Sequence, residues 1–297
     1  MARRAAFRDV DRSDDTGALV RYLDATRIVP LLVAAEWLLR SELRIGPGSR
    51  VLDVGCGAGD DALALADLVT PGGAVVGIDP SAAMVEEARR RAAGRVLPVE
   101  FRPGRAERLD TPAASFDACR FARVLQHVED PLAALREAAR ALRPGGQVAA
   151  LEPDWRDLEV GGADPSVTRR VLDVRLRSIP SPGVGADLPR LLAEAGFEEV
   201  RTVALRVSGA QAQALHVLRL ETYAAAAAEA GVVSGVESAA WLSDLAAAAS
   251  GGTLAVRVSL HLAAATRPGQ PAGRVAASSR ASSARLATPS LSNAVDR

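Results

Sequence analysis

The sequence lacks lysine altogether, and it holds one asparagine, two cysteines and three histidines among its 297 residues. All 36 of its fixed positive charges are therefore arginines, and 36 carboxylates balance them to a formal net charge of zero. Without excess charge the chain has no overall attraction to a phosphate backbone or an anionic membrane. We therefore expect a small-molecule partner, no nucleic acid and no membrane.

The few cysteines and the lack of long apolar runs exclude further classes. Cys56 and Cys119 have neither the spacing of metal ligands nor that of a disulfide framework, so we expect no metal site and no export. The charged N-terminus has no apolar stretch behind it, and no run of about 18 apolar residues follows. We predict neither a signal peptide nor a membrane span, and a cytoplasmic location.

Strand and helix patterns alternate through the middle of the chain. Apolar residues recur at helical spacing over residues 16–43, where Pro30 predicts a break. Short apolar runs, which predict five strands, begin at residues 51, 74, 99, 116 and 147, with helical patterns between them over 60–68, 82–93 and 131–142. Strands that alternate with helices indicate a parallel sheet covered on both faces.

The pattern changes after the fifth strand. Two stretches rich in Pro, Gly and Asp, residues 152–166 and 178–187, predict loops over the strand ends that could cover a ligand. A helix over 188–195 precedes two alternating stretches, 197–207 and 254–262, which predict a last antiparallel pair of strands. The alanine-rich interval between them should be helical.

Together these patterns predict an α/β fold: a doubly wound, Rossmann-like, mostly parallel sheet of seven strands with an antiparallel last strand and an N-terminal helical extension. Three regions follow. We expect residues 1–45 to form a helical segment and residues 46–265 to form the main domain. Residues 266–297 are rich in Ser, Ala, Pro and Arg without an apolar period, which predicts a disordered tail.

The strongest local signal is VLDVGCGAGDDA at residues 51–62, where an apolar strand runs into Gly55, Gly57 and Gly59 and a helix follows. Glycines at such a turn tolerate unusual dihedral angles and let bare backbone approach a ligand. The spacing lacks the third glycine of the dinucleotide fingerprint, and the two aspartates that follow would repel a pyrophosphate. A phosphate-free ligand with a positive centre fits better, because Asp53 could accept hydrogen bonds from its ammonium group.

An acidic residue ends the second predicted strand. Asp79 lies 20 residues after Gly59, where a carboxylate can accept two ribose hydroxyls. The same spacing fits more than one nucleoside cofactor, and a carboxylate at a strand end can equally cap the next helix. Alone, these features indicate a nucleoside site without identifying the nucleoside.

Taken in order, the segments from Val51 to Pro153 resemble the class I S-adenosylmethionine-dependent methyltransferases, especially the branch similar to quinone-biosynthesis and antibiotic-pathway enzymes. VLDVGCGAGDDA is similar to that family's cofactor loop, GIDPS to its ribose-binding strand end and PGRAERL to its adenine-contacting segment. SFDACRFARVLQHVED is similar to its fourth strand with the turn that follows, and LEPDW to its fifth strand end. The resemblance implies S-adenosylmethionine as cofactor, a methyltransferase domain at 46–265 and a small organic acceptor in secondary metabolism, and it leaves a homodimer open. It also implies that the N-terminal helical segment, residues 1–45, is a lid on the acceptor pocket.

The resemblance also assigns roles to residues of the glycine turn and the second strand end. The methionine and ribose parts of the cofactor would be held by Asp53, Gly55, Cys56, Gly57, Gly59, Asp79, Pro80, Ser81 and Met84. Arg105 stands where the family usually has aspartate, which leaves the backbone amide of Ala106 to contact the adenine. Phe121 and Ala122 stand where polar residues are frequent, so contacts there would come from backbone carbonyls.

Methyl transfer is an in-line displacement in which the cofactor supplies the activated group, so the protein mainly aligns the reactants. A general base is needed only when the acceptor must lose a proton. His127 follows the fourth strand and is the candidate base, although it could equally cap the helix that starts at Pro131. Tyr22 and Trp155 would line the acceptor pocket as flat walls, or else belong to the core.

Two other functions stay open. An NAD-dependent oxidoreductase would use the same sheet, but the glycine spacing differs and the lysine of a Tyr-x-x-x-Lys constellation is absent. A protein that keeps the cofactor fold without methyl transfer, in a binding or accessory role or with another reaction, is compatible with the departures at Arg105, Phe121 and Ala122.

Overall fold

The protein is described by a computed structural model over residues 16–209 and 218–269. Its strands are β1 (Arg50–Val54), β2 (Ala74–Asp79), β3 (Val99–Pro103), β4 (Phe116–Ala122), β5 (Leu142–Gly161), β6 (Glu198–Gly209) and β7 (Ala255–Thr266). Its helices are α1 (Thr16–Thr26), α2 (Pro30–Glu42), α3 (Asp60–Val69), α4 (Ala82–Ala92), α5 (Pro131–Ala141), α6 (Pro165–Ser178), α7 (Val184–Glu194), α9 (Leu220–Glu229) and α10 (Gly235–Ser250), with a 3₁₀ turn η2 (Leu125–His127).

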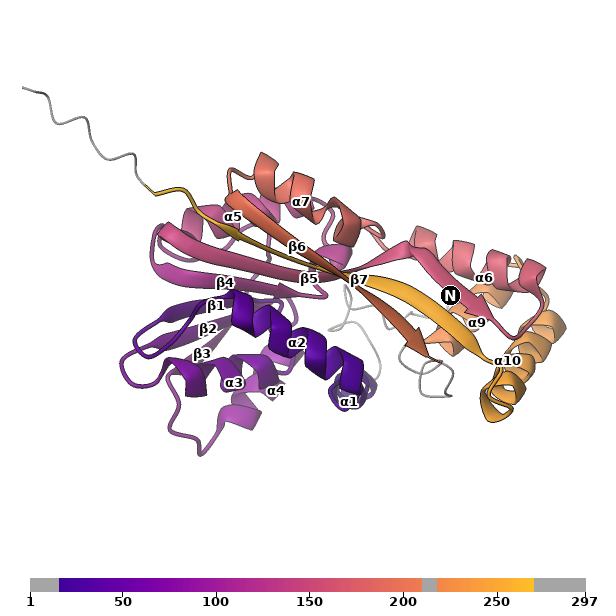
Figure 1. The fold of residues 1–297 in the computed structure, drawn as a ribbon. Coiled ribbons are helices and arrows are strands. Elements are labelled where there is room, and N and C mark those ends of the chain that lie inside the picture. The colour runs from indigo at the N-terminus through magenta and orange to yellow at the C-terminus, as the bar shows by residue number, and fades with distance from the viewer. Residues whose placement is uncertain (1–15, 210–217, 270–297) are drawn as a thin grey trace, which may run out of the picture.

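The seven strands form one sheet in the order β3-β2-β1-β4-β5-β7-β6, with helices on both faces (Figure 1). The pairs among β3, β2, β1, β4 and β5 are parallel, whereas β7 is antiparallel to both β5 and β6. The expected Rossmann-like sheet with an antiparallel last strand is therefore confirmed. The order reverses between β1 and β4, and such a switch point opens a crevice at the carboxyl ends of the strands.

Local signals explain where the helices begin. The Ser81 side chain accepts a hydrogen bond from the Met84 N–H at the start of α4, and Asp130 caps α5 in the same way ahead of Pro131. Such caps satisfy backbone donors that the first helical turn leaves unpaired. Pro30 is the first residue of α2 and separates it from α1, so the predicted break is confirmed.

Two apolar cores cover the two faces of the sheet. On one face α5 and α7 pack on the strands, and on the other α2, α3 and α4 do so. Ala35, Leu39 and Leu43 are buried in the second core. Of the predicted N-terminal lid, most of α2 is thus part of the sheet's cover (Figure 1), while α1 and the first residues of α2 line the cavity at the carboxyl ends of the strands.

The expected loop over residues 152–166 is wrong for most of its length. Strand β5 continues to Gly161, and after a register shift it pairs again with β7, so that Glu159 lies opposite Arg257. Trp155, Leu158 and Val160 pack against a third core formed with α6, α9 and α10. Non-local pairing and this packing make the segment a strand, and the long strands carry the three helices as an extension at one end of the sheet (Figure 1).

The remaining expectations for the second half hold in part. Helix α7 begins at Val184, four residues earlier than predicted, and the alanine-rich interval contains α9 and α10 as expected. The predicted tail begins too early, because Thr266 still pairs with Gln147 of β5; from residue 270 onward it lies outside the described residues. Within the described ranges, no helix is both long enough and apolar enough to cross a membrane.

Candidate active site

A cavity of about 1130 Å³ opens at the carboxyl ends of β1, β2 and β4, beside Pro153 and Trp155 in the middle of β5. One side is formed by the glycine turn and the end of β2. The other side is formed by the extension that contains α6, α9 and α10, with Trp155, Arg175 and Tyr223 in its wall. Tyr22 and Leu23 of α1 also line it. The cavity therefore joins the predicted cofactor region to the predicted acceptor region.

All but two of the predicted site residues line this cavity. They are Tyr22, Gly55, Cys56, Gly57, Gly59, Asp79, Pro80, Ser81, Met84, Arg105, Ala106, Ala122, His127 and Trp155. The two others lie beneath it: the Phe121 side chain is fully buried in the core, and Asp53 is fully buried beside Arg120.

The glycine turn has the backbone geometry that its sequence predicts. Gly57 and Gly59 have φ values of +51° and +87°, in the left-handed region that favours glycine. A Cβ atom on Gly59 would lie 2.7 Å from the Cβ of Ala88 and 2.8 Å from the Phe101 ring. A Cβ atom on Gly57 would meet only Leu23 of α1, at 3.4 Å. Gly59 thus permits close packing beneath the turn, while Gly57 presents bare backbone to the cavity.

Asp79 joins the glycine turn to the end of β2. Its Oδ2 accepts a hydrogen bond from the Gly57 N–H at 2.9 Å, and its Oδ1 accepts one from the Ser81 N–H at 2.9 Å. A carboxylate can accept about four hydrogen bonds in all. Asp79 can therefore fix the turn and also accept hydroxyl groups of a ligand.

A buried ion cluster lies under the turn. Arg120 donates to Asp53 at 2.7 Å, to Asp61 at 2.9 Å and to Glu36 at 2.5 Å. Burial raises the pKa of Asp53 to about 6, although Arg120 acts in the opposite direction. Burial lowers the pKa of Arg120, but the three carboxylates outweigh it and hold that pKa well above its ordinary value. Asp53 is thus paired with a cation of the chain itself.

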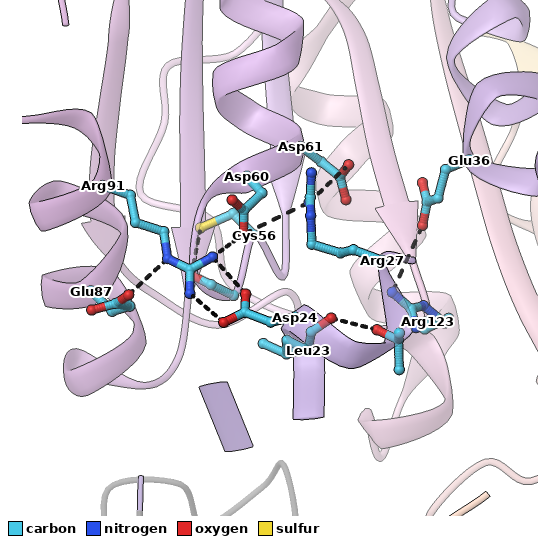
Figure 2. Close-up of polar contacts among 12 residues, drawn as sticks. Leu23, Asp24, Arg27, Glu36, Cys56, Asp60, Asp61, Glu87, Arg91 and Arg123 are labelled. Atoms are coloured by element: carbon cyan, nitrogen blue, oxygen red, sulfur yellow. Dashed lines mark hydrogen bonds and ion pairs between the residues drawn. The ribbon is translucent and has the colours of Figure 1, made fainter. Parts of the chain in front are cut away.

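A second set of ion pairs holds α1 over the turn (Figure 2). Arg91 of α4 binds Asp24 of α1 at 2.9 Å and Asp60 of α3 at 2.5 Å. Arg27, at the end of α1, lies 3.7 Å from Asp60 and 3.6 Å from Asp61. The aspartates that follow the glycines therefore anchor the N-terminal helix.

A buried glutamate positions the turn that follows β4. Glu152 accepts hydrogen bonds from the backbone N–H groups of Val124, Leu125 and Gln126 at 2.7, 2.8 and 3.3 Å. Burial raises its pKa to about 7 against the effect of these donors. The fixed turn carries His127 to the cavity wall.

The most conspicuous residue that the sequence did not single out is Arg175. It is 4% exposed, and its guanidinium carbon lies 4.0 Å from the centre of the Trp155 ring and 4.4 Å from that of Tyr223. A signal did exist, because Val167, Val171 and Arg175 follow one another at four-residue spacing and so share one face of a helix. A charged residue on the apolar face of a predicted helix indicates a buried charge.

Comparison with known proteins places residues 51–146 in a methyltransferase domain family. The chain is 40% identical over 234 residues to an uncharacterized 37.1 kDa protein in transposon TN4556 of Streptomyces fradiae, covering 77% of this chain and 66% of that protein. It is 35% identical over 123 residues to the demethylmenaquinone methyltransferase of Listeria monocytogenes, covering 39% of this chain and 52% of that enzyme. The chain thus spans just under two thirds of the first relative and about half of the second.

A solved structure shows the same fold. The YcgJ protein from Bacillus subtilis superimposes with a TM-score of 0.58 at 21% identity, covering 80% of this chain and 99% of that one. At this identity the likeness concerns the architecture alone. Together with the sheet order, it confirms the expected fold class.

Proposed function

Since the chain belongs to the class I S-adenosylmethionine-dependent methyltransferases, we propose that it transfers the methyl group of S-adenosylmethionine to a small organic acceptor. The observation that carries this proposal is the hydrogen bond between Asp79 and the Gly57 N–H, which joins the two predicted cofactor elements on one cavity. The likeness to a demethylmenaquinone methyltransferase supports an apolar acceptor. Secondary metabolism is the role that the resemblance favours.

The residues present fit the cofactor. The backbone at Gly57 leaves room that a Cβ would fill, and this room would receive the methionine part. Asp79 would accept the ribose hydroxyls. The Arg105 side chain is 70% exposed and pairs with Glu107, so the neighbouring backbone of Ala106 is left for the adenine. Asp53 is already paired with Arg120 beneath the turn, so it would support the methionine part of the cofactor indirectly, by fixing the turn.

The chemistry asks mainly for alignment. The bound cofactor supplies a methyl group on a sulfonium, and holding an acceptor atom in line with it removes several kcal/mol of the barrier. Trp155 donates a hydrogen bond from Nε1 to the Gln126 side chain at 2.6 Å, which fixes its ring as a flat wall for the acceptor. His127, on the same turn, would take a proton from an acceptor that must lose one.

Calorimetry with S-adenosylmethionine and S-adenosylhomocysteine tests the proposal. We expect both to bind, and Asp79→Ala to weaken binding markedly, whereas Glu86→Ala, which removes an exposed carboxylate of α4, should leave it unchanged. No measurable wild-type heat at millimolar cofactor would overturn the proposal.

A screen of cell metabolites with methyl-labelled cofactor then tests the transfer itself. A labelled small molecule would identify the acceptor and show which atom is methylated. Cofactor binding without any labelled product would instead favour the protein that keeps the fold without methyl transfer.

A further inference from the structure

Arg175 is a buried cation that the described residues leave without a carboxylate. Its side chain lies in the cavity wall between the rings of Trp155 and Tyr223, and it is 4% exposed. Its Nη1 donates to the Leu218 carbonyl at 2.6 Å, while its buried Nε has no hydrogen-bond partner in the described part of the chain. None of the ion pairs among those residues includes it.

One other arginine of the described structure, Arg120, is as deeply buried as Arg175, but its surroundings differ. Three carboxylates surround Arg120. Around Arg175, burial lowers the pKa, and the nearby Arg219 lowers it further. Burying a charge removes it from water, which costs free energy. An opposite charge nearby offsets part of that cost, and an unpaired buried charge lacks this compensation. Among the described residues no carboxylate fills this role, and the cavity that Arg175 lines gives a ligand access to it.

Much of this wall is apolar. Ile179 of the chain after α6 and Val256, Val258 and Leu260 of β7 line the same cavity. The two rings sandwich the guanidinium and hold it in a fixed plane, which suits the planar, two-point recognition of a carboxylate. The wall therefore combines an apolar surface with an oriented buried cation, and the nearby Arg219 adds a second positive charge.

We propose that the methyl acceptor is an organic acid, an apolar small molecule whose carboxylate pairs with Arg175. This assignment rests on the proposed function, since it names the class of molecule that shares the cavity with the cofactor. Arg27, which also lines the cavity, already pairs with Asp60 and Asp61, whereas no described carboxylate pairs with Arg175. Arg175 is therefore the cation that we assign to the acceptor.

The test compares organic acids with their neutral esters. The probes are benzoate, 4-butylbenzoate, 1-naphthoate and 1-hydroxy-2-naphthoate, each with its methyl ester, titrated at pH 7.5 into the full chain saturated with S-adenosylhomocysteine. We expect at least one acid to bind tenfold or more tightly than its ester. Arg175→Gln should abolish that difference without weakening the ester, and Arg175→Lys should retain part of it.

Two controls keep the outcomes distinct. Arg169→Gln removes an exposed arginine of the same helix and should change neither affinity. S-Adenosylhomocysteine should bind all variants equally, which also shows that Arg175→Gln is folded. If no acid is preferred over its ester by the wild-type chain, or if Arg175→Gln weakens the cofactor analogue instead, the inference is wrong. Failure of the wild-type chain to bind the analogue would overturn the proposed function, and the acid and ester comparison can still be made without it.

Discussion

Arg120 of β4 stands opposite Asp53 of β1 in the register of the sheet, with 2.7 Å between its Nη1 and the Asp53 Oδ1. The same guanidinium reaches Asp61 in the first turn of α3 and Glu36 of α2. One buried cation therefore connects the strand before the glycine turn, the helix after it and the N-terminal segment. The turn's shape thus depends on a charge network that reaches the cavity wall through Arg120 and Asp61.

Replacing Arg120 should destabilise the protein strongly. Arg120→Met leaves the fully buried Asp53 without its cation and removes a partner of Glu36 and Asp61, so we expect the free energy of unfolding to fall by about 3–5 kcal/mol in urea denaturation. Arg257→Met is the control, because it breaks an exposed pair with Glu159 and should cost under about 1 kcal/mol. Equal losses in the two variants would show that the cluster does not stabilise the fold.

Glu152 should make stability depend on pH. Its pKa of about 7 in the folded protein exceeds the ordinary 4.5, so between these values the folded state holds a proton that the unfolded state has lost. Stability from this group is therefore fully present below pH 4.5 and is lost as pH rises to about 7, by at most about 3 kcal/mol. Glu152→Gln does not titrate and should lack this slope.

Urea unfolding of both proteins at pH 5, 6, 7 and 8 measures the difference. Asp53, whose pKa is also raised, contributes equally to both curves and cancels. Parallel curves for the wild type and Glu152→Gln would contradict the prediction.

The ion pairs of Arg91 should control how tightly α1 closes over the turn. In the described structure, α1 has only a small apolar cluster, in which Leu19 packs against Met84 of α4. Arg91→Gln removes the bonds to Asp24 and Asp60, so amides of α1 should exchange about 3- to 10-fold faster with deuterium, and cofactor affinity should fall with them.

Arg90→Gln is a matched control for this effect. Arg90 precedes Arg91 in α4 and also binds Glu87, but it is 70% exposed and has no ion pair with α1 in the described structure. In the wild type, 1 M salt should screen the pairs and reproduce the faster exchange. Unchanged exchange in Arg91→Gln would mean that the ion pairs of Arg91 do not hold α1.

Local patterns suffice to predict the first half of this fold. Buried parallel strands are continuous apolar runs, and caps such as Ser81 and Asp130 mark where helices begin. The continuation of β5 has no such signal, because its partner residues near Arg257 lie far along the chain and its polar residues suggest a loop. Strand pairing between distant segments cannot be predicted from the sequence of either segment alone.

The same distinction separates the two halves of the site. The cofactor half depends on backbone shape, and glycines with Asp79 after the next strand report it directly. The acceptor half depends on which side chains the helical extension buries together. Arg175 is one of 36 arginines in the sequence, and only the approach of α9 with Tyr223 gives it a special environment.

His127 should be needed for turnover if the acceptor loses a proton. With the acceptor identified by the labelled cofactor, His127→Ala should lower kcat by about 100-fold or more, leave KM unchanged and remove the acidic limb of the pH–rate profile, because alanine cannot take the proton. His261→Ala is the control, since His261 lies on β7 and does not line the cavity. A variant with wild-type kcat across the whole pH range would show that alignment alone drives the transfer, and that His127 serves only the turn that Glu152 holds.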